Sequence, residues 1–190
     1  MIQAMPVVGI GGLPATGKSA LVKSLVNRLG GWVEFKPFQL GVVRGYYATE
    51  FGLLLIGLYG QETFPGTDRL SMAVQAPAID LIREAASNPA LRICRVLFEG
   101  DRLFTPSFVT AIREDSRISL RMLVLTASQE VLEQRRRQRL SVQSASWIAG
   151  RATKLRRLTE SFPDNFQTVT NETPEDAQRN IGTAMRLLNV

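Results

Sequence analysis

The sequence of 190 residues predicts one domain of the α/β class, with a parallel sheet of about five strands and helices on both faces. Three observations support this prediction. Apolar, strand-like runs alternate with amphipathic, helix-like segments. A glycine-rich stretch, GGLPATGKSA, joins the first strand to the first helix. The composition, 45% hydrophobic and 21% charged, is that of an ordinary globular domain.

The N-terminal half begins with the β-branched apolar run PVVGIG at 6–11, which predicts the first strand. The helix KSALVKSLVNRL follows and is expected to stop at the Gly-Gly pair 30–31. Residues 32–68 read as a β-rich segment, where we expect turns or bends at three glycines and one buried strand, LLLIGLY. The three glycines are Gly41, Gly45 and Gly52.

The C-terminal half continues the alternation. A helix is expected over DRLSMAVQAPAIDLIREAASNP, and Ser128 and Thr173 are the expected N-caps of two later helices, the second with Pro174 at its first position. Cys94 is expected inside an apolar strand. The remaining elements are the strands LRICRVLFEG, ISLRMLVLTA and FQTVT and the helices PSFVTAIREDS, QEVLEQRRRQRL and ETPEDAQRNIGTAMRLL.

The stretch GGLPATGKSA matches the phosphate-binding loop (P-loop), G-x-x-x-x-G-K-S, and lies between a strand and a helix as that motif requires. Its glycines permit a tight turn, its amides cradle the β-phosphate, its lysine reaches the β- and γ-phosphates, and its serine ligates Mg²⁺. The motif therefore predicts binding of ATP or GTP with Mg²⁺. The predicted nucleotide-binding residues are Gly12, Ala15, Thr16, Gly17, Lys18, Ser19 and Ala20, together with Arg135 from the basic segment described next.

The net charge of +6 is concentrated in one segment. Residues 135–157 contain eight basic residues and no acidic one, whereas the rest of the chain has 15 basic and 17 acidic residues. So many uncompensated cations favour a polyanionic ligand, which is ATP or the backbone of DNA. Histidine is absent, so any general base must be a carboxylate.

Three stretches, GIGGLPATGKSALVKSL, MLVLTASQEVLEQRRRQR and TVTNETPEDA, resemble the nucleoside and nucleotide kinase branch of the P-loop proteins over most of the chain. The resemblance implies a P-loop kinase fold and transfer of the γ-phosphoryl group of ATP. It also implies an arginine-bearing lid that closes over the transferred group, for which we assign residues 135–157. The lid candidates are Arg135, Arg136, Arg137, Arg139, Arg151 and Lys154, of which Arg137 is expected to be catalytic.

Three carboxylates are candidates for the chemistry. Glu99 and Asp101 end a core strand, where active-site crevices of parallel sheets form, and Glu99 is expected to hold Mg²⁺ or to take a proton. Asp68 is either the N-cap of the helix that follows it or the general base for the acceptor hydroxyl. Arg69, its neighbour, is a candidate phosphate ligand.

The acceptor is expected to bind beside the β-rich segment 32–68, which holds all three tyrosines. Most of its aromatic residues are expected in the core, but Tyr46 and Tyr47 next to Arg44 could stack on a base. The full set of predicted substrate-binding residues is Arg44, Tyr46, Tyr47, Arg69, Arg102, Arg151 and Lys154.

The stretch FPGTDRLSMAVQ, the kinase frame and the basic lid together resemble the bacteriophage kinases that phosphorylate 5-hydroxymethyluracil in DNA. That resemblance implies phosphorylation of the 5-hydroxymethyl oxygen of a base flipped out of the duplex. Two alternatives remain open: a kinase of free nucleosides or nucleoside monophosphates, and a DNA-binding module that closes on ATP without turnover. The single cysteine and the lack of a signal peptide or membrane span predict a cytoplasmic protein, in an infected bacterial host if it is phage-encoded.

Overall fold

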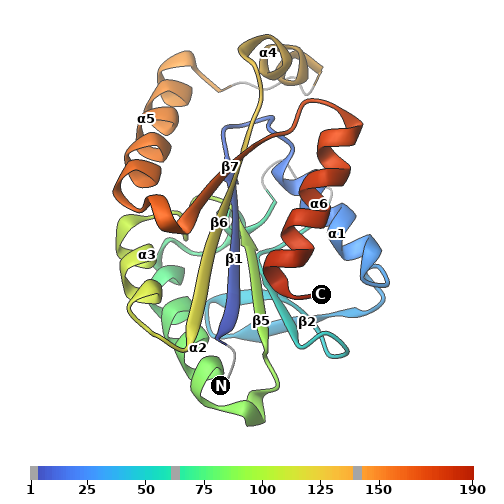
Figure 1. Ribbon diagram of the computed structural model, residues 1–190, viewed down its shortest axis with the longest axis vertical. Helices are drawn as coiled ribbons and strands as arrows, with labels where there is room; N and C mark the ends of the chain where they lie inside the picture. Colours follow the sequence, from blue (N-terminus) through green and yellow to red (C-terminus); the bar gives the residue numbers. More distant parts are fainter. Residues whose placement is uncertain (1–3, 61–64, 139–142) are drawn as a thin grey trace.

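In the computed structural model, which describes residues 4–60, 65–138 and 143–190, seven strands form one sheet in the order β2-β3-β4-β5-β1-β6-β7 (Figure 1). The strands are β1 (Met5–Gly12), β2 (Phe35–Leu40), β3 (Val43–Ala48), β4 (Leu53–Ile56), β5 (Arg95–Glu99), β6 (Ile118–Thr126) and β7 (Phe166–Thr170). The helices are α1 (Lys18–Arg28), α2 (Gln75–Ser87), α3 (Pro106–Arg113), α4 (Gln129–Gln138), α5 (Ala145–Ser161) and α6 (Pro174–Leu188). Short 3₁₀ turns are η1 (Thr67–Arg69), η2 (Met72–Val74), η3 (Pro89–Leu91) and η4 (Pro163–Asn165).

The five neighbouring strands β4, β5, β1, β6 and β7 are parallel, and the expected α/β class is confirmed. The five parallel strands match the expected number, and the segment 32–68 adds two further strands, β2 and β3, which pair antiparallel at one edge. Gly45 lies within β3 and not in a turn. A Cβ atom there would stand 2.0 Å from the carbonyl oxygen of Leu55, so this glycine permits close approach of β4. Gly41 and Gly52 do lie in turns, each with φ of 56°.

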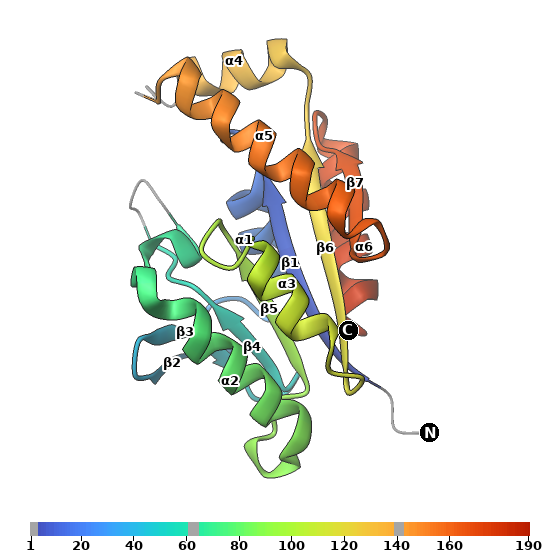
Figure 2. The same cartoon turned by 90° about the vertical axis from the view of Figure 1, so that its left-hand side faces the viewer.

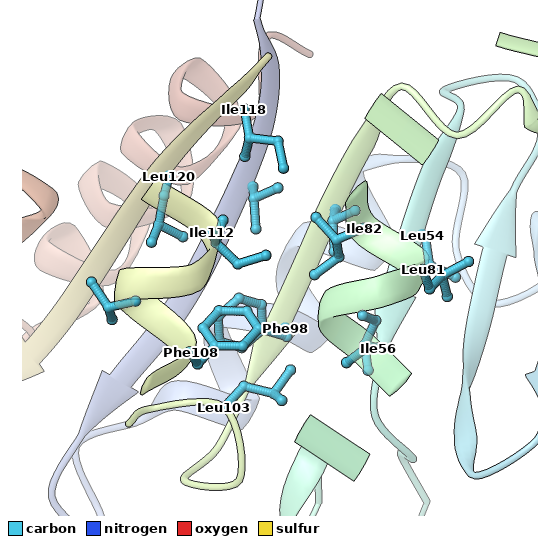
Figure 3. Packing of buried hydrophobic residues seen from close by; sticks show 14 of the residues in the cluster. Leu54, Ile56, Leu81, Ile82, Phe98, Leu103, Phe108, Ile112, Ile118 and Leu120 are labelled. Atoms are coloured by element: carbon cyan, nitrogen blue, oxygen red, sulfur yellow. The ribbon is translucent and has the colours of Figure 1, made fainter. Parts of the chain in front are cut away.

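Helices cover both faces of the sheet, as expected, because neighbouring strand residues point to opposite sides. In β1, Val7 faces the core under α2, α3 and α5, whereas Val8 faces the core under α1 and α6. Figure 3 shows the first of these cores, where Phe98 of β5 packs against Phe108 of α3 at a ring-centroid distance of 5.2 Å. Both faces of the central strands are thus buried, which fixes the positions of their ends.

The expected helix caps are confirmed. The Thr173 side chain accepts from the Asp176 amide in a complete capping box, and the Ser128 hydroxyl accepts from the amide of Val131 at 3.4 Å. Pro174 occupies the first turn of α6. Cys94 differs from the expectation: it is exposed and precedes β5, which begins only at Arg95.

The basic segment 135–157 does not form one element but spans the end of α4 and most of α5. Both views place α4 beyond the end of the sheet where β1 runs into the P-loop, and Figure 2 shows α5 crossing near β6 and β7. The C-terminal strand ends and the two basic helices therefore surround one region.

No helix among the described residues is long and apolar enough to cross a membrane.

Candidate active site

The loop between β1 and α1 has the backbone conformation that its glycines allow. Gly12 has φ of 138° and Gly17 has φ of 93°, values that residues with a side chain rarely adopt. A Cβ atom on Gly17 would also stand 2.5 Å from Asn171 Nδ2. Ala15 is left-handed too, with φ of 70°. The conformation places the loop amides before the first turn of α1, where Lys18, Ser19 and Ala20 begin the helix.

The loop is held from the far end of the chain. Asn171 Nδ2 donates to the carbonyl oxygen of Thr16 at 2.7 Å, and Asn180 Nδ2 donates to Asn171 Oδ1 at 3.2 Å. Arg135 donates to the carbonyl oxygens of Ala15 at 3.3 Å and of Asn171 at 2.9 Å. Arg135 thus lies beside the loop that it was expected to serve. Sequence reasoning missed Asn171 and Asn180, although asparagine directly after a strand was the available signal.

The serine of the loop contacts a buried carboxylate. Ser19 Oγ donates to Glu99 Oε1 at 2.7 Å, because the register of β1 and β5 sets Glu99 opposite Ile10, just before the loop. Glu99 is only 2% exposed, and its Oε2 has no hydrogen-bond partner among the described residues. Lys18 Nζ donates to the carbonyl oxygens of Gly12 and Leu13, each at 3.0 Å. The strand end and the P-loop therefore form one site.

Asp68 lies in the 3₁₀ turn η1, and the N-cap of that turn is Gly66. The N-cap alternative for Asp68 is therefore wrong: α2 begins seven residues later, at Gln75, with Val74 at its N-cap. Asp68 Oδ1 instead accepts a hydrogen bond from the backbone amide of Asp101 at 2.8 Å. This bond holds the Asp68 carboxylate beside the end of β5.

These groups share a cavity of about 500 Å³. It lies between the P-loop, the end of β5 and the basic helix α5. Its lining includes Gly12, Ala15, Lys18, Ser19, Asp68, Glu99, Asp101, Arg102, Arg136, Trp147, Arg151 and Lys154. The cavity thus gathers four of the predicted nucleotide-binding residues, all three candidate carboxylates and three of the predicted substrate-binding cations, whereas Thr16, Gly17, Ala20 and Arg135 do not line it.

Burial governs the ionisation of the two inner carboxylates. It raises the pKa of Asp68, against the opposing charges of Arg151, Lys18, Arg102 and Lys154. Burial likewise raises the pKa of Glu99, opposed by the Ser19 hydrogen bond and by the charge of Lys18. A carboxylate whose pKa lies above its ordinary value holds a proton better, which suits a general base.

The basic helices contribute unequally. Arg136 of α4 lines the cavity, whereas Arg137, the expected catalytic residue, does not. The side chain of Arg137 is 84% exposed and lies 3.9 Å from Glu133. On α5, Arg151 forms an ion pair with Asp101, and its guanidinium lies 5.1 Å from the centroid of the Trp147 ring. Arg139 lies outside the described residues, as does Phe64 of the FPGTDRLSMAVQ stretch.

The tyrosines expected to stack on a base lie elsewhere. Tyr46 donates its hydroxyl to the carbonyl oxygen of Tyr59 at 3.0 Å, and Tyr47 donates to that of Arg92 at 2.7 Å. Neither tyrosine lines the cavity, and nor do Arg44 and Arg69. The expected glycine turn beside Tyr46 is instead a continuous strand, so both rings are fixed against the sheet edge.

The chemistry of the site fits Mg²⁺ shared with a nucleotide. The described residues contain no cluster of three or more His, Cys, Asp or Glu side chains that would hold a metal by itself. The Ser19 hydroxyl and the unpartnered Oε2 of Glu99 are instead two oxygen groups of the kind that bind Mg²⁺ together with phosphates and water.

Known proteins offer one distant structural similarity and no match in sequence family. No family model matches the chain, and no curated protein matches it. Among solved structures it is similar to the crystal structure of a gluconokinase from Sinorhizobium meliloti 1021, with 16% identity and a TM-score of 0.45, over 98% of this chain and 97% of the other. A similarity this distant carries no information about the substrate. Fold and site define an α/β protein with a P-loop and a carboxylate-lined cavity.

Proposed function

We propose that the protein is an ATP-dependent phosphotransferase that transfers the γ-phosphoryl group of ATP to an alcohol. The observation that carries the proposal is the meeting of three groups in one cavity: the P-loop lysine, the hydrogen-bonded Ser19 and Glu99, and the partly buried Asp68. Two separately positioned carboxylates allow one to serve Mg²⁺ and the other to take the proton of the acceptor hydroxyl.

In the proposed reaction the acceptor hydroxyl oxygen attacks the γ-phosphorus, and the bond from that phosphorus to the β,γ-bridging oxygen breaks. Asp68 takes the hydroxyl proton, and ADP leaves with the bonding electron pair. Lys18 and Arg136 stabilise the charge on the phosphoryl oxygens. Mg²⁺ held by Ser19, and by Glu99 directly or through water, supplies further charge neutralisation when bound.

The acceptor that we propose is the 5-hydroxymethyl group of 5-hydroxymethyluracil in DNA. The resemblance in sequence supports it, and so do the cations of α5 along the cavity, because a DNA strand entering there would be partly neutralised by them. The base would reach Asp68 only when flipped out of the stack. The second candidate is a free nucleoside or nucleoside monophosphate.

The test is a panel of acceptors offered with Mg²⁺ and terminally labelled ATP. It contains 5-hydroxymethyluracil DNA, thymine DNA, free nucleosides and monophosphates. We expect label only in the modified DNA, with a KM for DNA that rises steeply with salt. Label only in a free nucleotide would replace DNA by the second candidate. ATP-dependent DNA binding without transfer to any acceptor would make the protein a nucleotide-gated binding module.

A further inference from the structure

Three cations of the cavity lining come from the loop after β5 and from α5, and we refer to Arg102, Arg151 and Lys154 as the acceptor-side cations. Arg102 comes from the loop after β5, and the other two come from α5. Arg151 is compensated by its ion pair with Asp101. Arg102 and Lys154 form no ion pair within the part of the chain that the structure describes.

Both of these cations without an ion pair are partly withdrawn from water. The Nε atom of Arg102 is buried and has no hydrogen-bond partner among the described residues. Lys154 is partly buried, and burial together with the charges of Arg151 and Arg102 lowers its pKa, although the nearby Asp68 carboxylate opposes this shift. Burying like charges side by side is unfavourable unless an anion binds among them. The arrangement is therefore that of an anion site.

The triphosphate of ATP is not the anion that this site fits best. The P-loop with Lys18 already lines the cavity beside Ser19 and Glu99, and Arg136 follows Arg135, which donates to Ala15 of that loop. Asp68 instead accepts from the amide of Asp101, whose carboxylate pairs with Arg151, and the charges of all three acceptor-side cations act on Asp68. The acceptor-side cations thus surround the carboxylate that receives the acceptor hydroxyl.

We propose that Arg102 and Lys154 bind a phosphate carried by the acceptor itself, so that the site takes a nucleotide unit in preference to a free nucleoside. This inference rests on the proposed function and narrows its substrate class to phosphate-bearing alcohols. A phosphodiester of DNA and the phosphomonoester of a free nucleotide present the same charged oxygens to the site, and the experiment separates these two sources.

The experiment compares three acceptors with saturating ATP: 5-hydroxymethyl-2′-deoxyuridine, its 5′-monophosphate, and a short oligonucleotide with one 5-hydroxymethyluracil. We expect Lys154→Gln and Arg102→Gln to raise KM about 10-fold or more for the phosphate-bearing acceptors, since a charge-assisted hydrogen bond is lost. KM for ATP and for the nucleoside should change less than about 2-fold by the same reasoning. A preference for oligonucleotide or monophosphate identifies the source of the phosphate.

Arg186→Gln, on α6 at the opposite face of the sheet, is the matched control for loss of one positive charge. Lys154→Gln keeps the test valid if Arg102→Gln fails to fold, because Lys154 lies on the outer helix α5. A raised KM for ATP would assign these cations to the nucleotide and overturn the proposal. Equal use of nucleoside and nucleotide by the unchanged protein would also overturn it.

A binding measurement separates this inference from the proposed function. Trp147 lines the cavity, so its fluorescence in a Trp32→Phe background reports on ligands there. The 5′-monophosphate is titrated with a non-hydrolysable ATP analogue filling the P-loop. If Lys154→Gln weakens this binding and the unchanged protein transfers no label from ATP in the acceptor assay, the anion site is kept and the kinase is refuted. Transfer without any effect of Lys154→Gln or Arg102→Gln would keep the kinase and refute the anion site.

Discussion

The two walls of the cavity are built differently. The P-loop wall is bonded to distant, buried residues: Thr16 is 1% exposed, and its carbonyl accepts from Asn171, which Asn180 holds in turn. The α5 wall is loosely attached, since Leu158 is the one described residue of α5 that is fully buried. The P-loop wall is thus preformed, whereas the α5 wall can adjust its position. Under the proposed function, substitutions in the P-loop wall should change KM for ATP and the free energy of unfolding. Substitutions in the α5 wall should change KM for the acceptor.

Lys18→Ala should have the largest effect on the P-loop wall. We expect phosphoryl transfer to fall on the order of 10³-fold or more, because the cation at the transferred phosphates is lost while the fold is retained. Labelled-phosphate transfer and thermal unfolding measure the two quantities. Lys23→Ala, on the exposed side of α1, is the control. Robust turnover by Lys18→Ala would refute the P-loop assignment.

Asp68→Asn should come next, with kcat about 10²-fold lower and KM for ATP nearly unchanged, since general bases contribute at least this much. Burial raises the pKa of Asp68 above its ordinary 3.8. Below that raised pKa the carboxyl is protonated and cannot accept the hydroxyl proton, so the rate should fall as the pH falls through it. Rate profiles against pH should show this acidic limb in the unchanged protein and not in the variant.

Glu99→Gln tests the carboxylate shared with the P-loop. We expect a higher Mg²⁺ concentration for half-maximal activity and a lower kcat, because the glutamine side chain lacks the negative charge of the carboxylate that contacts Ser19 and would attract the metal. Rates measured over a range of Mg²⁺ concentrations test this expectation. If high Mg²⁺ does not restore the rate and Asp68→Asn is fully active, then Glu99 is the base and the assigned roles are reversed.

Asn171→Ala should destabilise the P-loop wall by about 1–3 kcal/mol, because the buried carbonyl of Thr16 loses its donor. Urea unfolding measures the loss, and KM for ATP should rise as well. Asn165→Ala removes a similar bond to the carbonyl of Leu120, away from the loop. That control should cost stability without changing KM for ATP. If both variants raised KM for ATP equally, the bond from Asn171 to Thr16 would have no special role in holding the P-loop wall.

Asp101→Asn should have the smallest effect on stability, about 1 kcal/mol or less, since its ion pair with Arg151 is partly exposed. Because Asp101 pairs with Arg151 of α5, this substitution should change KM for the acceptor and leave KM for ATP unaltered. Thermal unfolding and acceptor kinetics measure both. A change in KM for ATP would show that the α5 wall also serves the nucleotide.

The sequence was sufficient to predict what depends on local pattern. The P-loop, the strand ending in Glu99 and the caps at Ser128 and Thr173 each follow from a short motif and its flanks. The α/β class follows from the alternation of such segments. These features depend on residues close together in the chain, which is why a single sequence contains them.

What the sequence did not predict depends on packing between distant segments. In the run of three arginines at 135–137, the choice of the one that faces the cavity depends on how α4 is rotated, and Arg136 is that residue. The tyrosines of β3 were misplaced because Gly45 serves close strand approach and not a turn. Asn171 was missed because its partner, Thr16, is 155 positions earlier in the chain, and Asn180 was missed because it acts on the loop only through Asn171.

That separation has a consequence for synthesis on the ribosome. The P-loop is translated long before two of the side chains that brace it, because Asn171 lies 155 positions after Thr16 and Asn180 lies later still. A nascent chain therefore carries the loop without the hydrogen bond from Asn171 until β7 and α6 have emerged. We expect the loop to reach its final conformation late in folding, after β7 has paired with β6 and α6 has packed against α1.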